Sequence, residues 1–233
     1  MAGTPTPTEG NTPAQSKEIW TKIIDTVKAV ITNPAEFYRG MPKTGGFQDP
    51  LIFMVVMGVA TGLIQAILGI VHVGMRVSVG MALASIVISP IIIGIAGFIG
   101  GAILFVIWKL MGSQESYETA YRCGAYAAAI WPITTLLGII PYIGPLIGLA
   151  WGLWLLVIAS VEVHKIAAKT AWLVFGIIAA LLAILSLGAQ AAGRRAVRTA
   201  GDFQKQYSES LKAMQKAQED AAREAAKQEK TAP

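Results

Sequence analysis

An uncharged stretch of about 40 residues constrains this chain more than any other feature. No Asp, Glu, Lys or Arg occurs from Cys123 to Val161, and about 20 apolar residues already suffice to cross the hydrocarbon core of a bilayer. Pro141, Gly144 and Pro145 lie near its middle, and proline and glycine there stop a helix and favour a turn. The stretch therefore predicts two transmembrane helices joined by a tight turn.

The distribution of charge shows that this hairpin belongs to a larger membrane domain. Charged residues make up 14% of the chain, against about 25% in a soluble domain. Only eight of them lie between Leu51 and Gly193. We therefore predict an all-α polytopic membrane protein with a membrane domain over residues 50–192. Its apolar runs predict five spans, at about 51–73, 85–108, 119–140, 146–163 and 167–191.

The second apolar run is longer than one span needs but too short for two. It extends from about Val79 to Met111, whereas one tilted helix uses about 17–25 residues. We predict that its first residues form a re-entrant or interfacial piece, and that the span itself is kinked at Pro90. A sixth span is therefore not expected.

The flanks of the membrane domain differ from it in composition. Residues 1–15 are rich in Thr, Pro and Gly, which predicts disorder. Residues 16–32 predict an amphipathic helix that lies either along the membrane surface or against the protein, and the sequence favours neither. A Gly/Pro loop is expected up to Pro50, with Asp49 capping the first span. Residues 193–233 predict a charged, Ala-rich helical tail.

The net charge of +5 is a signal of topology rather than of nucleic-acid binding, because no basic patch with interleaved aromatic residues occurs. Five spans put the two ends on opposite sides of the membrane. Lys and Arg residues near the predicted span ends favour a cytoplasmic N-terminus and an outside C-terminus. The basic residues at the start of the tail favour a cytoplasmic C-terminus instead.

Glycines at helical spacing form the first set of candidate functional positions. Small residues four apart let transmembrane helices approach closely, within one chain or between copies. Packing within one chain is favoured over a homo-oligomer. The positions are Gly58, Gly62, Gly97, Gly101, Gly144, Gly148 and Gly152.

Charged residues at the ends of the third and fourth spans form the second set. Arg122 follows Glu118 by four residues, a spacing that pairs side chains on one helix face, and Ser116 is suited to cap that helix. We predict that this cluster is structural and that Glu162 pairs with Arg122 to lock the hairpin. The cluster comprises Glu118, Arg122, Glu162, His164 and Lys165.

The sequence predicts no catalytic, metal or cofactor site. It has two histidines and one cysteine, too few for a metal site of the usual kind. The expected role of Cys123 is that of a small residue at a helix interface.

Several short motifs carry a family resemblance. They are Ile31-Thr32-Asn33-Pro34 with Phe37, Asp49-Pro50-Leu51, Tyr117-Glu118 with Tyr121-Arg122 and Ala125-Tyr126, the spacing of Pro132, Pro141 and Gly144, and Ile158 to Lys165 with His164. Over about residues 30–190 the chain resembles the Yip1-domain (Yip1/YIPF) membrane protein family, in its prokaryotic branch.

The resemblance implies five spans, a cytosolic N-terminus and no known catalysis. Eukaryotic members are similar to adaptors that bind Rab GTPases and one another. They have an Asp-Leu-Ala-Gly-Pro-like start to the first span, where this chain has Gly46-Phe47-Gln48-Asp49-Pro50, and this departure weakens any inference of GTPase binding.

Two function classes follow from these features. The first is a non-catalytic membrane scaffold or adaptor that contacts the lipid bilayer and meets protein partners through residues 16–40 and the tail. The alternative is a transporter or channel for small solutes or ions, which helices broken at Pro90, Pro132 and Pro141 would allow. The uncharged spans favour the first class.

Overall fold

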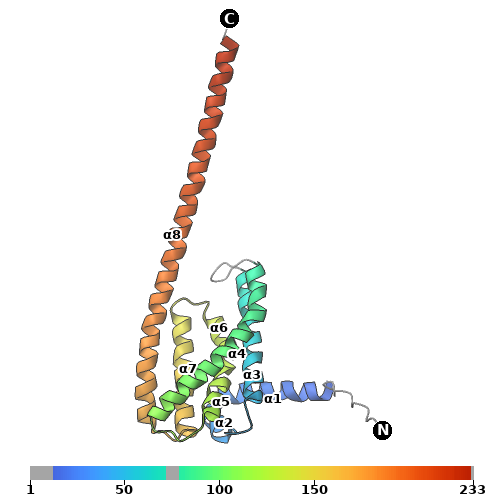
Figure 1. The fold of residues 1–233 in the computed structure, drawn as a ribbon, viewed down its shortest axis with the longest axis vertical. Coiled ribbons are helices and arrows are strands. Elements are labelled where there is room, and N and C mark those ends of the chain that lie inside the picture. Colours follow the sequence, from blue (N-terminus) through green and yellow to red (C-terminus); the bar gives the residue numbers. More distant parts are fainter. Residues whose placement is uncertain (1–12, 72–78, 232–233) are drawn as a thin grey trace, which may run out of the picture. The chain divides into compact units, whose positions relative to one another are not determined.

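The computed structural model describes residues 13–71 and 79–231 (Figure 1). Most of the predicted disordered segment, residues 1–15, lies outside this range. Every regular element in the described part of the chain is helical, which confirms the all-α prediction. In chain order these are α1 (Pro13–Thr32), α2 (Pro34–Gly40), α3 (Gln48–Ile70), α4 (Val79–Leu110), α5 (Tyr117–Ala127), the 3-10 turn η1 (Ala128–Ile130), α6 (Trp131–Leu137), α7 (Ile143–Glu162) and α8 (Ala168–Thr231).

Four of the described helices are long and apolar enough to cross a membrane: α3, the Ile91–Leu110 part of α4, α7 and α8. This number is roughly consistent with the prediction of about five spans. The segment expected as the third span, about 119–140, consists of α5, η1 and α6 in succession. The new helix α6 begins at Trp131-Pro132, because the proline ring cannot donate the backbone hydrogen bond that would continue α5 through this point.

The chain divides into two compact units, one up to Ala183 and one from Ile184 to Pro233. The second unit is the continuation of α8 as a single helix. Among its described residues, the exposed large apolar side chains are Ile184, Leu185, Val197, Phe203, Tyr207, Leu211 and Met214. The first unit contains all the other helices and the core.

Close packing in the first unit depends on glycines of α4. A side chain on Gly97 would meet the thioether of Met54 on α3, and one on Gly101 would lie 3.1 Å from the ring of Tyr121 on α5. Both glycines therefore let α4 approach its neighbours within one chain. Gly58 and Gly62 are buried on α3.

The turn between α6 and α7 is tighter than a β-turn. Tyr142 has φ 65° and ψ −50°, and the Ile143 amide donates to the Pro141 carbonyl over 2.8 Å, as in a strained γ-turn. A side chain on Gly144 would collide with the carbonyl oxygen of Leu137. Glycine is therefore required where the two helices separate.

The same face of α7 continues past α6 with two further glycines. A methyl group on Gly148 would lie 3.2 Å from the side chain of Thr134, and one on Gly152 would lie 4.0 Å from Ile130. The contact is tight near the turn and looser towards the middle of α7.

The core of the first unit lies towards one end of the bundle. Trp108, Tyr38 and Tyr121 are its largest fully buried side chains. By contrast, large apolar residues along the outer face of α4 are exposed, as expected for a surface that faces lipid: Ile91, Ile92, Ile95, Ile99 and Ile103.

In α4 the part long and apolar enough to cross a membrane is Ile91–Leu110, and the prediction that the residues before it form a re-entrant or interfacial piece stays a prediction. Two local predictions are wrong. Residues 37–40, expected to begin a loop, belong to the helix α2, since Pro34 in its first turn suits a helix start. The residue before α3 is Phe47, and no side chain caps the helix. Asp49 instead forms an ion pair with Lys22 at 3.1 Å.

Replacing Gly144 with alanine should destabilise the hairpin. The added methyl group has no space beside the Leu137 carbonyl, and overpacking of this kind costs about 1–3 kcal/mol. Gly176→Ala is the control, because nothing lies within 4 Å of its Cβ position. Thermal unfolding in mild detergent should show a lower midpoint for Gly144→Ala alone. Equal midpoints for the two variants would contradict the packing described here.

Candidate functional site

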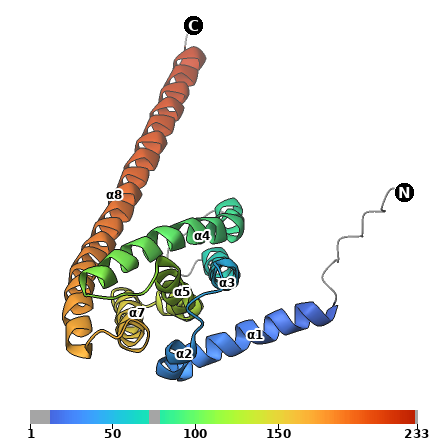
Figure 2. The ribbon, with the colours of Figure 1, turned by 60° about the horizontal axis from the view of Figure 1, so that its bottom comes forward.

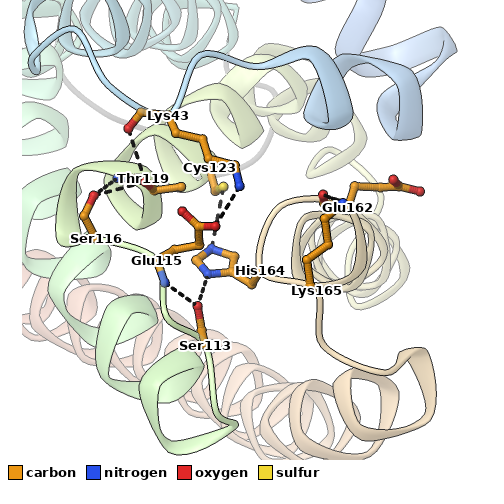
Figure 3. A network of polar contacts seen from close by, with 9 residues as sticks. All are labelled: Lys43, Ser113, Glu115, Ser116, Thr119, Cys123, Glu162, His164 and Lys165. Carbon is orange, nitrogen blue, oxygen red and sulfur yellow. Dashed lines mark hydrogen bonds and ion pairs between the residues drawn. The ribbon is translucent and has the colours of Figure 1, made fainter.

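Polar side chains gather at the end of the bundle where α4 and α7 finish and α5 begins. Figure 2 brings this end forward, with α1 and α2 beside α5 and α7. Figure 3 shows part of this region, with side chains from the loops after α2, α4 and α7, from α5 and from the end of α7. The polar network, as the term is used below, comprises Arg39, Lys43, Ser113, Glu115, Glu118, Arg122, Glu162 and His164.

The loop between α2 and α3 is held by two residues of α5. The Gly46 amide donates to Glu118 Oε1 over 2.7 Å, and Arg122 Nη2 donates to the Gly46 carbonyl over 2.6 Å. Arg122 also contacts Glu118 Oε1 at 3.4 Å and is only 3% exposed. The predicted i,i+4 pair therefore exists, and both partners also bind the backbone of a loop 76 and 72 residues away in sequence.

Glycine is required at two positions of this loop. Gly45 and Gly46 have φ of 116° and 79°, in the region that side chains other than glycine rarely adopt. A methyl group on Gly45 would also lie 3.1 Å from Arg122 Nη2. The two glycines let the loop backbone reach the buried guanidinium.

A second clasp joins the same loop to the α4–α5 connection. Lys43 Nζ lies 2.7 Å from Glu115 Oε1, and the hydroxyl of Thr119 donates to the Lys43 carbonyl over 3.2 Å. Ser116 caps α5 as predicted, since its hydroxyl accepts from the Thr119 amide at 3.2 Å.

Glu162 has a different partner from the one predicted. Its carboxylate accepts two hydrogen bonds from Arg39, both at 2.9 Å, from Nε and Nη2. This bidentate pair joins α2 to the end of α7, and such geometry is specific to arginine. The predicted pair of Glu162 with Arg122 does not form, because Arg122 is occupied by the loop. Lys165, which has φ 57°, donates to the Glu162 backbone carbonyl over 2.8 Å.

His164 is buried at the centre of the network, with 5% of its surface exposed. Its Nδ1 lies 2.7 Å from Ser113 Oγ, and its Nε2 lies 3.9 Å from Cys123 Sγ. The ring stacks on Trp108 with centroids 3.9 Å apart, and the Trp108 indole donates to Ser160 over 2.7 Å. The imidazole thus packs three elements together: α4, α5 and the end of α7.

Burial lowers the pKa of His164 to about 4, because desolvation disfavours the charged imidazolium. The carboxylate of Glu115 opposes this effect, while Lys43 and Lys109 reinforce it. His164 is therefore neutral at pH 7.

The network shows no access for a substrate. Ser113, His164 and Cys123 are 3%, 5% and 0% exposed, so their proximity does not form an open nucleophilic site. Among the residues whose positions are described, no group of three or more His, Cys, Asp or Glu side chains could hold a metal ion. The arrangement can hold helices and a loop together, because its charged side chains pair with groups on neighbouring elements.

Sequence reasoning missed several members of this site. In the sequence Arg39 and Lys43 belong only to the basic N-terminal flank that indicates topology, and no local pattern assigns a structural role to Ser113, Glu115 or Trp108. Their partners lie between 51 and 123 residues away in sequence, so no local pattern could have identified them.

Comparison with known proteins adds one finding. A family model described as the Yip1 domain matches residues 28–189, a range that begins within α1, ends within α8 and includes the whole polar network. No curated protein and no solved structure matches the chain.

Charge reversal tests the Arg39–Glu162 pair. Arg39→Glu and Glu162→Arg should each lower the unfolding midpoint in detergent, because each places like charges opposite one another. The double variant should recover much of the loss. In the matched control, Glu162→Arg combined with Arg122→Glu should give no recovery, since these two residues are not partners. Recovery in the control and none in the Arg39 combination would refute the pairing.

Stability should depend on pH through His164. The unfolded state binds a proton near pH 6.5 but the folded state only near pH 4. Stability is therefore complete above pH 6.5 and falls as the pH is lowered towards 4, by about 3 kcal/mol in total. In His164→Gln this part of the pH dependence should disappear, as measured by unfolding midpoints from pH 7.5 to 4.5. The same slope in both proteins would show that His164 is not the group responsible.

Proposed function

This chain belongs to the Yip1-domain family, and from that premise we propose that it is a non-catalytic membrane scaffold or adaptor. One observation carries the proposal: the charged residues at the polar end of the bundle fasten the N-terminal segment to the membrane domain. The clasps are the Arg39–Glu162 and Lys43–Glu115 pairs and the hydrogen bond from the Tyr38 hydroxyl to the Cys123 carbonyl at 3.2 Å. An adaptor requires a surface displayed rigidly on the membrane, and such clasps supply one.

The proposed partner-facing parts are residues 16–40 and the tail. On α1 the polar side chains of Glu18, Thr21 and Asp25 are exposed. On the tail Phe203 and Tyr207 are 69% and 66% exposed, and exposed aromatic side chains on a polar helix suit a protein interface. Both surfaces are free to meet another protein while the bundle remains folded.

Transport is the less favoured alternative. A groove of about 450 Å³ lies between α6, α7 and the first turns of α8, lined by apolar residues with Thr134 and Thr135 as its only hydroxyl groups. A path for ions or polar solutes needs charged or strongly polar groups at membrane depth. This groove offers no such lining.

We further propose that the protein lies in the inner membrane of a bacterial cell with its N-terminus in the cytoplasm and its C-terminus outside. The lysines and arginines near the predicted span ends support this orientation.

Deleting residues 1–40 would be a poor test of the adaptor role, because it removes Val30 and Tyr38, which are 0% and 1% exposed. Surface variants are better suited. Asp25→Lys with Glu18→Lys on α1, and Phe203→Ser with Tyr207→Ser on the tail, should each reduce in-membrane cross-links to a specific partner by roughly ten-fold, the effect of about 1.4 kcal/mol. The unfolding midpoint should stay unchanged.

The control is Lys109→Gln, an exposed substitution outside both surfaces, which should leave cross-linking intact. Cross-links that survive both sets of surface variants would contradict the proposed partner surfaces. Flux of ions or small solutes through liposomes containing the purified protein would support transport instead.

A further inference from the structure

Packing of α1 on the bundle leaves several of its apolar side chains uncovered, Ile19 at 41% exposure among them. Ile23 and Val30 are 8% and 0% exposed and belong to the core. Trp20 and Ile24, one turn apart, are 55% and 51% exposed. These two residues are called the Trp20–Ile24 stripe below. Exposing a tryptophan and an isoleucine to water is unfavourable. We therefore expect this stripe to be covered by something other than the bundle.

The charges of α1 are separated around this stripe. Lys17, Trp20, Ile24 and Lys28 follow one another at intervals of three and four residues, so they lie along one face of the helix, with a lysine before and after the apolar pair. Glu18 and Asp25 lie about 100° further around the helix, beside this face. A lysine therefore lies at each end of the stripe, and the two carboxylates lie along one side of it.

The position of α1 relative to α3 indicates the depth of the stripe relative to the membrane. Lys22 Nζ lies 3.1 Å from Asp49 Oδ2 in the first turn of α3, where the apolar crossing helix begins. Between the two helices is a small groove of about 200 Å³ lined by Ile19, Ile52 and other residues. Figures 1 and 2 show α1 lying across the start of α3 rather than along it. Because α3 crosses the bilayer, α1 lies at the membrane surface.

We propose that the Trp20–Ile24 stripe inserts into the interfacial layer of a bilayer that contains anionic lipid, with Lys17 and Lys28 at the headgroup phosphates. Tryptophan is enriched at this depth because its ring is amphipathic, and a helix with apolar residues on one face and lysines at its border is suited to this location. The positive border matches a negative lipid surface. Glu18 and Asp25 then face water, where the proposed partner surface lies, but the lipid contact does not depend on the adaptor role.

Single-cysteine labelling of the full-length protein tests the depth of the stripe. Cys123 is the only cysteine and is 0% exposed, so a nitroxide reagent will label a cysteine introduced on α1 selectively. Ile24→Cys lies in the stripe, and Asp25→Cys, its neighbour in sequence, points about 100° away from it around the helix. Each labelled variant is reconstituted in vesicles of three parts phosphatidylcholine to one part phosphatidylglycerol, and relaxation by oxygen is compared with relaxation by a water-soluble nickel chelate.

The label at position 24 should be accessible to oxygen and shielded from nickel, and the label at position 25 should show the reverse. Equal accessibility to nickel at both positions would overturn the proposal. Spin–spin broadening at position 24 would show instead that a second copy of the chain covers the stripe, which also overturns it.

The role of charge is tested with Lys17→Gln and Lys28→Gln in the Ile24→Cys background. The ratio of inserted to water-exposed label should fall roughly five-fold for each lysine removed in the anionic vesicles. Lys→Arg at the same positions should preserve it, and pure phosphatidylcholine vesicles should abolish the difference between lysine and glutamine. If the ratio changes neither when the lysines are replaced nor when the anionic lipid is omitted, the proposed contact between the lysines and the lipid phosphates is refuted. The cross-linking variants of the proposed function leave Trp20 and Ile24 unchanged, so the two proposals can fail separately.

Discussion

The packing of the polar end of the bundle depends on the buried guanidinium of Arg122, which needs partners for its charge and its hydrogen bonds. At 3% exposure a positive charge needs a partner and further hydrogen bonds, and leaving such a group unpaired costs about 3–5 kcal/mol. Glu118 supplies the charge and Gly46 supplies the backbone carbonyl. The loop after α2 therefore has to pass beside α5, and this brings α2 and the start of α3 to their places.

The remaining contacts of this end follow from the same geometry. Once the loop is in place, Lys43 reaches Glu115, and Arg39 on α2 reaches Glu162 at the end of α7. His164, neutral and stacked on Trp108, fills the space beneath. Four helices and three loops are thus joined by charged and aromatic groups where water and lipid meet, whereas glycine contacts join the helices within the apolar region. Close approach at glycines suits van der Waals packing of helices in lipid, whereas charged groups are costly within the hydrocarbon core and lie outside it.

The charged side chains at this end hold the N-terminal segment against the membrane domain. The Arg39–Glu162 and Lys43–Glu115 pairs and the Arg122–Gly46 hydrogen bond each fasten the N-terminal segment, and the Ser113–His164–Cys123 contacts are closed to solvent. One side of α1 packs on the bundle and one polar side is exposed. In the proposed function this helix is a fixed platform for a partner, and in the further proposal the Trp20–Ile24 stripe inserts at the membrane surface.

The sequence by itself determined the features that neighbouring residues encode. The length of the apolar runs established an all-α membrane protein, because a bilayer requires about 20 apolar residues for each helix. Ser116 as a cap and Glu118 with Arg122 as a pair could be predicted because their partners are three and four residues away. Pro132 marked the break between α5 and α6 because its ring acts on its own helix.

Only the tertiary structure decided which distant groups meet. Glu162 binds Arg39 rather than Arg122, Asp49 binds Lys22 rather than capping α3, and His164 lies between Ser113 and Cys123. These choices depend on how helices pack and on which charge is already occupied, and neither quantity is a property of a local stretch of sequence. Residues 123 positions apart, such as Arg39 and Glu162, become neighbours only after the whole bundle has formed.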